Sequence, residues 1–145
     1  MNRRFLLADD DADDASIFCE ALTAIAPVME CYTAGNGIEL FEMLLRHLPH
    51  PPDVIFLDIN MPVMNGWQCL RKLKADADFR DIPVIMYSTS SAKKDIDMAY
   101  NLGVRVFLTK PEDVRELGKI LEIVANSSKD SLPGQLKGFK SVKLN

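Results

Sequence analysis

The alternation of apolar runs with amphipathic stretches restricts most strongly how this chain can fold. Five times within the first 126 residues, a short apolar run is followed by a stretch whose apolar residues recur at helical spacing. Runs without polar alternation are typical of strands buried on both faces, as in a parallel sheet covered by helices on both sides. The pattern predicts strands at residues 5–8, 28–34, 54–57, 84–87 and 104–109.

This arrangement predicts the fold class and the part of the fold where chemistry takes place. Five strand–helix units are too few for an eight-fold barrel, so the prediction is an α/β fold with an open, doubly wound parallel sheet. Sheets of this type bind ligands at the carboxyl ends of their strands. The residues that follow each predicted strand are therefore the candidates for a functional site.

The composition supports one globular domain followed by a short tail. The chain has 145 residues, of which 48% are hydrophobic and 26% are charged, close to the average for globular proteins. We predict a domain over residues 1–126 and a basic C-terminal tail over 127–145, which holds four lysines and one aspartate. Leu132, Leu136 and Val142 are spaced like a helical face, but Pro133 and two glycines interrupt it. Both a flexible tail and a docked tail are compatible with this pattern.

Charge and cysteine content argue against several classes of protein. A net charge of −4 does not favour nucleic-acid binding, and no apolar run approaches the roughly 20 residues of a membrane span. The apolar run at residues 5–8 is too short for a signal peptide. Cys19, Cys31 and Cys69 are odd in number and lack C-x-x-C spacing, which predicts neither a disulfide framework nor a zinc site. A cytoplasmic location is the corresponding expectation.

The residues at the predicted strand ends form a chemically coherent set. Asp9-Asp10-Asp11 follows the first strand, and Asp58 follows the third. Carboxylates that converge on one crevice favour a bound cation, and oxygen ligands suit Mg²⁺. Ser88 and Lys110, after the fourth and fifth strands, could contact the oxygens of a phosphoryl group, with Asp58 as its acceptor.

Each of these residues also has an ordinary structural interpretation. Acidic residues at strand ends often cap the following helix, and Asp11 or Asp13 could cap the first helix in this way. A hydroxyl after a strand is commonly a helix cap, and a single lysine is commonly a solvated surface residue. Only the occurrence of the complete set at successive strand ends favours a functional site.

Four motifs, in order over residues 3–126, resemble those of the response-regulator receiver domain, the phosphoacceptor module of two-component signalling. Asp9-Asp10 resembles the acidic pair of this family, and residues 53–66 (DVIFLDINMPVMNG) resemble its central signature. Residues 83–88 (PVIMYS) and 107–111 (FLTKP) resemble its hydroxyl-bearing strand and its lysine-proline corner. The resemblance implies a flavodoxin-like (βα)5 fold with strand order 2-1-3-4-5.

The resemblance also implies a role for each acidic position. Asp58 matches the phosphorylated residue of the family. The implied ligands of Mg²⁺ are Asp9, Asp10, Asp58 and the backbone carbonyl of Asn60. Asp11 is a departure from many family members, and we expect it to cap the first helix.

Three further positions carry implied roles in phosphorylation and switching. Ser88 and Lys110 match the residues that contact the phosphoryl group, and the Lys110–Pro111 peptide bond is expected to be cis. Phe107, together with Ser88, matches the switch of the family. Phe107 has no hydroxyl, so a switch that hydrogen-bonds through tyrosine is not available.

The implied function is that of a phosphoacceptor response regulator without a DNA-binding domain, in which only self-catalysed phosphoryl transfer and slow autodephosphorylation occur. The expected partners are a sensor histidine kinase or histidine phosphotransfer protein, a downstream protein and a phosphorylation-dependent second copy. Nucleic acid and membrane are not expected as partners. Output is expected through the face of the fourth helix, the fifth strand and the last helix. Single-domain receivers that are paired with phytochrome kinases are similar around Asp9 and Ser88.

Two alternatives come from other classes of protein. A haloacid-dehalogenase-like phosphatase also uses an aspartyl phosphate and Mg²⁺, but its nucleophile follows the first strand in a D-x-D motif, whereas Asn60 stands at the second acidic position here. A flavodoxin needs a phosphate-binding loop where this chain has Asp9-Asp10-Asp11. A receiver that acts as an unphosphorylated scaffold is a third hypothesis, against which the complete set of site residues argues.

Overall fold

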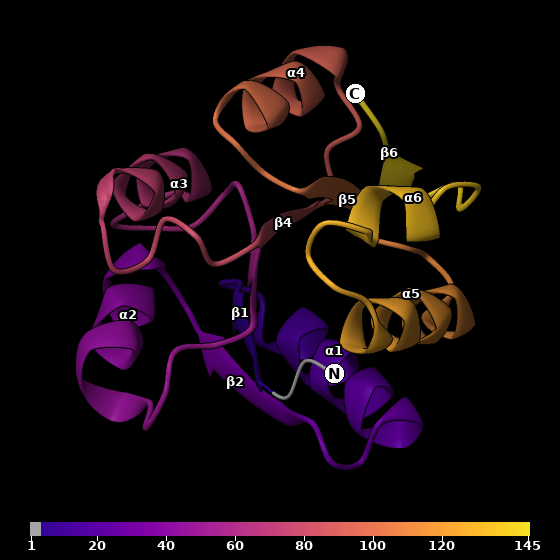
Figure 1. Ribbon diagram of the computed structural model, residues 1–145, viewed down its shortest axis with the longest axis horizontal. Coiled ribbons are helices and arrows are strands. Elements are labelled where there is room, and N and C mark those ends of the chain that lie inside the picture. The colour runs from indigo at the N-terminus through magenta and orange to yellow at the C-terminus, as the bar shows by residue number, and fades with distance from the viewer. Residues whose placement is uncertain (1–3) are drawn as a thin grey trace.

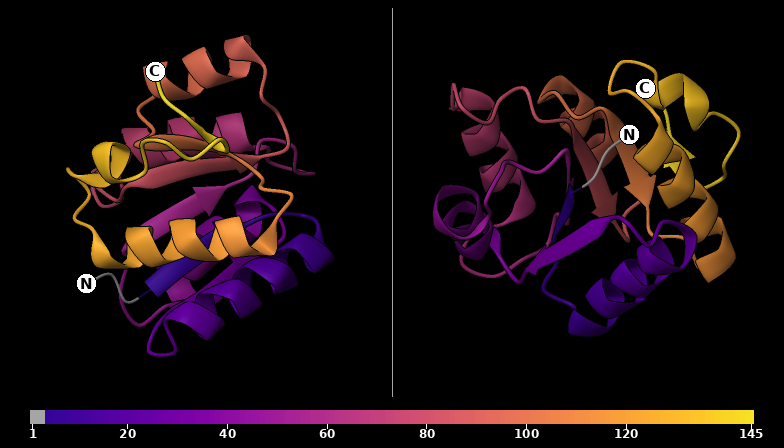
Figure 2. Two further views of the ribbon diagram at one scale, coloured as in Figure 1. Left: turned by 90° about the vertical axis from the view of Figure 1, so that its right-hand side faces the viewer. Right: turned by 60° about the horizontal axis from the view of Figure 1, so that its bottom comes forward.

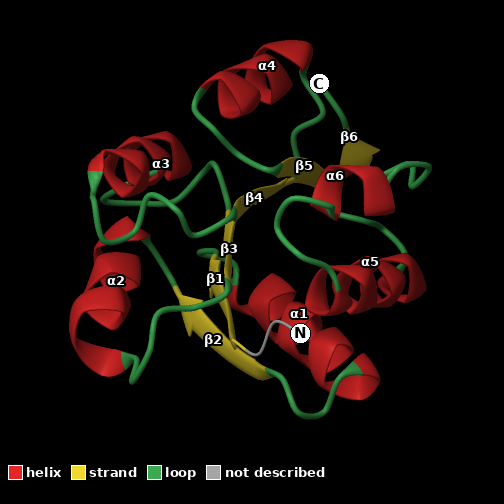
Figure 3. Ribbon diagram, viewed as in Figure 1, coloured by secondary structure: helices red, strands yellow, loops and turns green. Residues whose placement is uncertain are grey.

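The predicted parallel sheet is present, with the strand order β2-β1-β3-β4-β5, and a sixth strand, β6, extends it at the β5 edge (Figure 1; β3 is labelled in Figure 3). This computed structural model describes residues 4–145, so residues 1–3 of the predicted domain lie outside the described residues. The predicted fold class and strand order are confirmed. The strands are β1 (Arg4–Ala8), β2 (Glu30–Ala34), β3 (Val54–Leu57), β4 (Val84–Ser88), β5 (Val106–Thr109) and β6 (Val142–Lys143).

Helices cover both faces of the sheet (Figure 3). One hydrophobic core joins the sheet to α1, α5 and α6, and a second joins it to α2, α3 and α4. Alternate residues of each strand enter alternate cores: Phe5 and Leu7 of β1 face the first, and Leu6 and Ala8 face the second. The helices are α1 (Ala12–Ile25), α2 (Gly37–Glu42), α3 (Gly66–Ala75), α4 (Lys93–Asn101), α5 (Val114–Asn126) and α6 (Leu132–Gln135), and a π-helical turn, η1 (Met43–His47), continues α2.

The parallel register places four strand ends at the same edge of the sheet. Ala8 of β1 pairs with Leu57 of β3, and Ser88 of β4 pairs with Thr109 of β5. Because the next residues along the chain are Asp9, Asp58 and Lys110, the sheet itself brings distant parts of the sequence together.

The C-terminal segment, residues 127–145, packs against the rest of the molecule (Figure 2). Leu132, Leu136 and Val142 are buried and belong to the core that contains α1 and α5. Strand β6 runs antiparallel to β5, with Leu108 opposite Val142. The interruptions seen in the sequence are therefore compatible with a short helix and a short strand that each bury apolar residues.

The C-terminal segment is also held by polar contacts to α4 and to the residues in and beside β5. The Tyr100 hydroxyl accepts a hydrogen bond from the Phe107 N–H (3.1 Å) and donates one to the Lys143 carbonyl (2.6 Å). Arg105 forms an ion pair with Asp130 (3.6 Å). Tyr100 thus links the end of the tail to the strand beneath it.

The prediction of no disulfide is wrong. Cys19 of α1 and Cys31 of β2 form a disulfide, with their Cα atoms 5.7 Å apart, a normal separation for such a bond. The odd count leaves Cys69 as a buried free thiol. The count and spacing of the cysteines were misleading because the pairing arises from the packing of α1 beside β2, which a sequence motif does not encode.

The expectation of a cis Lys110–Pro111 peptide bond is also wrong, since the described residues contain no cis peptide bond. The family motif supplies only the proline, whose tertiary amide lowers the cost of the cis form without requiring it.

Candidate functional site

Three carboxylates gather at the strand ends, as expected. Asp9 and Asp10 follow β1, Asp58 follows β3, and one carboxylate oxygen of each lies within 4.8 Å of the others. Asp9 and Asp58 are buried, whereas Asp10 is exposed. Burial of like charges at this distance is unfavourable unless a cation compensates them.

The two carboxylate oxygens of Asp9 have different partners. Oδ1 accepts a hydrogen bond from the Asp11 N–H (3.0 Å), while the buried Oδ2 lies 2.8 Å from the Lys110 ammonium. Asp11 itself accepts hydrogen bonds from the N–H groups of Asp13 and Asp14, so its expected role as the cap of α1 is confirmed.

The loop after Asp58 is shaped by a glycine. A Cβ on Gly66 would lie 2.1 Å from the carbonyl oxygen of Asp58, closer than any side chain permits. The Gly66 N–H donates to the Ile59 carbonyl (2.8 Å), which closes the loop between β3 and α3. Gly66 therefore lets α3 begin directly against the backbone of Asp58.

Lys110 supplies the positive charge of the site. Its Nζ lies 2.8 Å from Asp9 Oδ2 and 3.7 Å from Asp58 Oδ2 as ion pairs. It donates a hydrogen bond to a further carboxylate, Asp14 Oδ2 of α1, at 2.9 Å. One ammonium thus faces carboxylates from two strand ends and a helix, and the site remains acidic.

The protonation of Asp58 is sensitive to this environment. Burial is the main cause that raises the pKa of Asp58, to about 7; Lys110 opposes the rise and the charge of Asp9 adds to it. For Lys110, burial works to lower the pKa, but the contacts with Asp9 and Asp14 outweigh it and raise the pKa. At neutral pH, a cation near Asp58 would therefore compete with a proton and favour the ionised carboxylate.

The residues present fit a divalent cation. Asp9, Asp10 and Asp58 offer hard oxygen ligands, and one carboxylate oxygen of each lies within 4.8 Å of the others. Two of the carboxylates are buried and one is exposed, which leaves room for the waters that Mg²⁺ usually retains. Asn60 lies in the exposed loop two residues after Asp58.

Ser88 and Phe107 are both fully buried at neighbouring strands. The Ser88 carbonyl accepts a hydrogen bond from the Lys110 N–H (2.7 Å), and Ser88 Oγ accepts one from the Ser90 N–H (3.2 Å). The Thr109 hydroxyl donates to the Ser90 carbonyl (2.9 Å). These contacts connect the loop after β4 to the end of β5, so a displacement of Ser88 would also displace that loop.

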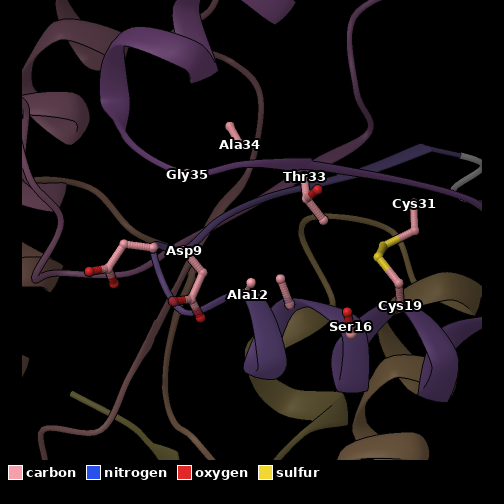
Figure 4. A pocket seen from close by; sticks show the side chains of 10 residues that line it. Asp9, Ala12, Ser16, Cys19, Cys31, Thr33, Ala34 and Gly35 are labelled. Carbon is pink, nitrogen blue, oxygen red and sulfur yellow. A yellow bond between two sulfur atoms is a disulfide. The ribbon is translucent and has the colours of Figure 1, made fainter.

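The site includes features that the sequence argument missed. The contact of Asp14 with Lys110 is not predicted from the sequence, although the place of Asp14 in the first turn of α1, beside the acidic run, is a usable signal. An open cavity of about 390 Å³ also extends from Asp9 and Asp10 along α1 and β2 to the Cys19–Cys31 disulfide. Figure 4 shows Asp9 at one end of this cavity and the disulfide at the other.

Comparison with known proteins agrees with this architecture. The family model for the response regulator receiver domain matches residues 5–122, and the chain belongs to this family. Receiver domains are signalling modules of two-component systems rather than classical enzymes; they bind divalent metal in an aspartate cluster and interact with kinases and downstream targets. Among residues 4–145, no helix is long and apolar enough to span a membrane.

Similar proteins include chemotaxis and phytochrome-associated regulators. The chemotaxis protein CheY1 of Helicobacter pylori is 29% identical over 125 residues, covering 86% of this chain and 98% of that protein. The solved structure of the phosphorylated cyanobacterial phytochrome response regulator RcpA has a TM-score of 0.75 and 29% identity, covering 86% and 91% of the two chains. The Mn²⁺-bound form of response regulator Rcp1 shares the fold, with a TM-score of 0.72, 24% identity and coverage of 96% and 98%.

Proposed function

We propose that this chain is a phosphoacceptor response regulator in which Asp58 receives a phosphoryl group from a histidine kinase or a histidine phosphotransfer protein. The observation that carries the proposal is the placement of a buried Asp58 carboxylate beside Asp9, Asp10 and the Lys110 ammonium. This placement provides a nucleophile, oxygen ligands for a cation and a compensating positive charge in one pocket.

In the proposed reaction, a carboxylate oxygen of Asp58 attacks the phosphorus atom while the bond from phosphorus to the donor nitrogen breaks. The product is an acyl phosphate on Asp58, and a proton is taken up by the departing imidazole. Bound Mg²⁺, held by Asp9, Asp10, Asp58 and the carbonyl of Asn60, would offset the negative charge of the transferred group. Lys110 would contact a phosphoryl oxygen, and Ser88 would donate a hydrogen bond to another.

The same residues account for the limited chemistry that we propose. Transfer is catalysed by the receiver itself, and the acyl phosphate is lost slowly to water. Residues 1–126 would form the receiver and residues 127–145 an accessory segment. The Cys19–Cys31 disulfide does not support the argument for a cytoplasmic location that rests on the cysteines. Because histidine kinases that use ATP are the proposed donors, we nevertheless propose a cytoplasmic location.

We propose that partners bind the face formed by α4, β5 and α5, but the C-terminal segment already occupies part of this face. On this face, Tyr100 and Arg105 are engaged by the C-terminal segment, whereas the Lys93–Asp97 ion pair is exposed. A downstream protein or a second copy of the chain would therefore bind beside β6 or displace it. Because Phe107 is fully buried, its proposed switch role would consist of a change of position within the core.

The test is phosphorylation by a small donor followed by intact mass measurement. Incubation with acetyl phosphate and Mg²⁺ is expected to add one phosphoryl group, and EDTA is expected to prevent it. Asp58→Asn should abolish the addition, while Asp78→Asn, at an exposed site elsewhere, should leave it unchanged. A wild-type chain that gains no phosphoryl group would contradict the proposal and favour an unphosphorylated scaffold.

A further inference from the structure

The ammonium of Lys110 already has carboxylate partners. It would have to give up some of these contacts in order to bind a phosphoryl group on Asp58. It lies 2.8 Å from Asp9 and 2.9 Å from Asp14, but 3.7 Å from Asp58. The ammonium donates a hydrogen bond to Asp14 and is paired with Asp9 at nearly the same distance. In the form without a phosphoryl group, Lys110 is therefore held more closely by its neighbours than by the phosphoacceptor.

Asp14 differs from Asp9 in what it can do when Lys110 moves. Asp9 is buried and belongs to the proposed metal ligands, whereas the side chain of Asp14 is 37% exposed and lies on α1. Its carboxylate reaches Lys110 across 96 residues of sequence. Capping of α1 does not need Asp14, because Asp11 provides the cap.

We infer that Asp14 is a positioning residue for phosphorylation, which competes with the phosphoryl group on Asp58 for Lys110. This inference rests on the proposed function. When Asp58 carries the phosphoryl group, Lys110 turns toward its oxygens and the hydrogen bond to Asp14 is lost. The competition weakens the phosphorylated state, and the loss of the contact exposes an unpaired carboxylate on the surface of α1.

Lys110 would therefore transmit the phosphorylation of Asp58 to two parts of the structure, the loop after β4 and helix α1. Through its backbone N–H, Lys110 is linked to Ser88 and the loop after β4. Through its ammonium, it is linked to α1. A partner that contacts the first turn of α1 would therefore meet a neutralised Asp14 before phosphorylation and a free negative charge afterwards.

The inference is tested with beryllofluoride, which mimics the acyl phosphate, in the presence of Mg²⁺. Removal of the competitor in Asp14→Asn is expected to lower the Kd for beryllofluoride threefold to tenfold relative to the matched control Asp13→Asn. Asp13 lies in the same turn of α1 and has the same charge, but it does not contact Lys110. In a Lys110→Ala background, the two variants are expected to bind equally, because the competition requires the ammonium.

The outcomes separate this inference from the proposed function. Wild-type protein that binds no beryllofluoride would contradict both. Wild-type binding with equal Kd values for Asp14→Asn and Asp13→Asn would overturn the role of Asp14 alone, as would weaker binding by Asp14→Asn. A difference in Kd between the two variants that persists in the Lys110→Ala background would show that the negative charge of Asp14 acts on the site without Lys110. That result would also overturn the proposed role of Asp14. Circular dichroism of each variant verifies that the fold is retained.

Discussion

The acidic pocket and the C-terminal segment satisfy their polar and charged groups in opposite ways. In the pocket, the carboxylates of Asp9, Asp10 and Asp58 lie within 4.8 Å of one another, and the single ammonium of Lys110 is shared among Asp9, Asp14 and Asp58. In the C-terminal segment, backbone groups pair with β5, and Leu136 packs in the core. This difference indicates that the segment is arranged to stabilise the fold, while the pocket is arranged for groups that bind to it.

The largest expected effect on the free energy of unfolding comes from a substitution in the C-terminal segment. Leu136→Ala should lower the free energy of unfolding by about 3 to 4 kcal/mol, because the leucine is buried and leaves a cavity. The exposed Leu144 is the matched control, and its replacement by alanine should cost far less. Urea denaturation measures both. Equal, small losses would mean that the segment does not contribute to the core in solution.

The disulfide lies at the other edge of the sheet and is expected to have the next largest effect. Reduction of Cys19–Cys31 should lower the free energy of unfolding by about 2 to 3 kcal/mol, since the bond restricts the unfolded chain. Thermal unfolding with and without dithiothreitol measures the loss. The double variant Cys19→Ser/Cys31→Ser should be insensitive to dithiothreitol, and a wild-type chain that is equally insensitive would argue against the bond.

A stabilising substitution is expected in the pocket. The pKa of Asp58 is about 7 in the folded protein and about 3.8 in the unfolded chain, so between these values the folded state holds a proton that the unfolded state has released. Stability should therefore fall as the pH rises from about 4 to 7. Asp58→Asn should remove this fall and stabilise the metal-free protein at pH 8, where the wild-type carboxylate is ionised.

Urea denaturation across this pH range measures the effect, with Asp78→Asn as a control at an exposed site. A wild-type pH dependence that persists unchanged in Asp58→Asn would contradict the charge crowding that distinguishes the pocket from the C-terminal segment.

The sequence predicts the pocket well because its residues are placed by the sheet. Apolar runs mark the strands, parallel strands share a carboxyl-end edge, and Asp9, Asp58, Ser88 and Lys110 each lie at or just after a strand end. The contacts among Asp9, Asp58 and Lys110 follow from this topology together with the register of the pairing.

Features that depend on helix packing could not be predicted in the same way. The contact of Asp14 with Lys110 requires the position of α1 relative to β5, and the Cys19–Cys31 pair requires its position relative to β2. The docking of the tail depends on whether Leu132 and Val142 find a complementary surface. Pro133 and the glycines report only local preference, which tertiary packing can override.

The pocket carries an excess of negative charge, which a bound divalent cation would compensate. The most direct test of this compensation is thermal unfolding with and without Mg²⁺. At ten times its Kd, Mg²⁺ should stabilise the wild-type protein by about 1.4 kcal/mol. Asp10→Asn should abolish this gain, whereas Asp13→Asn should retain it. Wild-type unfolding curves that superimpose with and without Mg²⁺ would contradict the account.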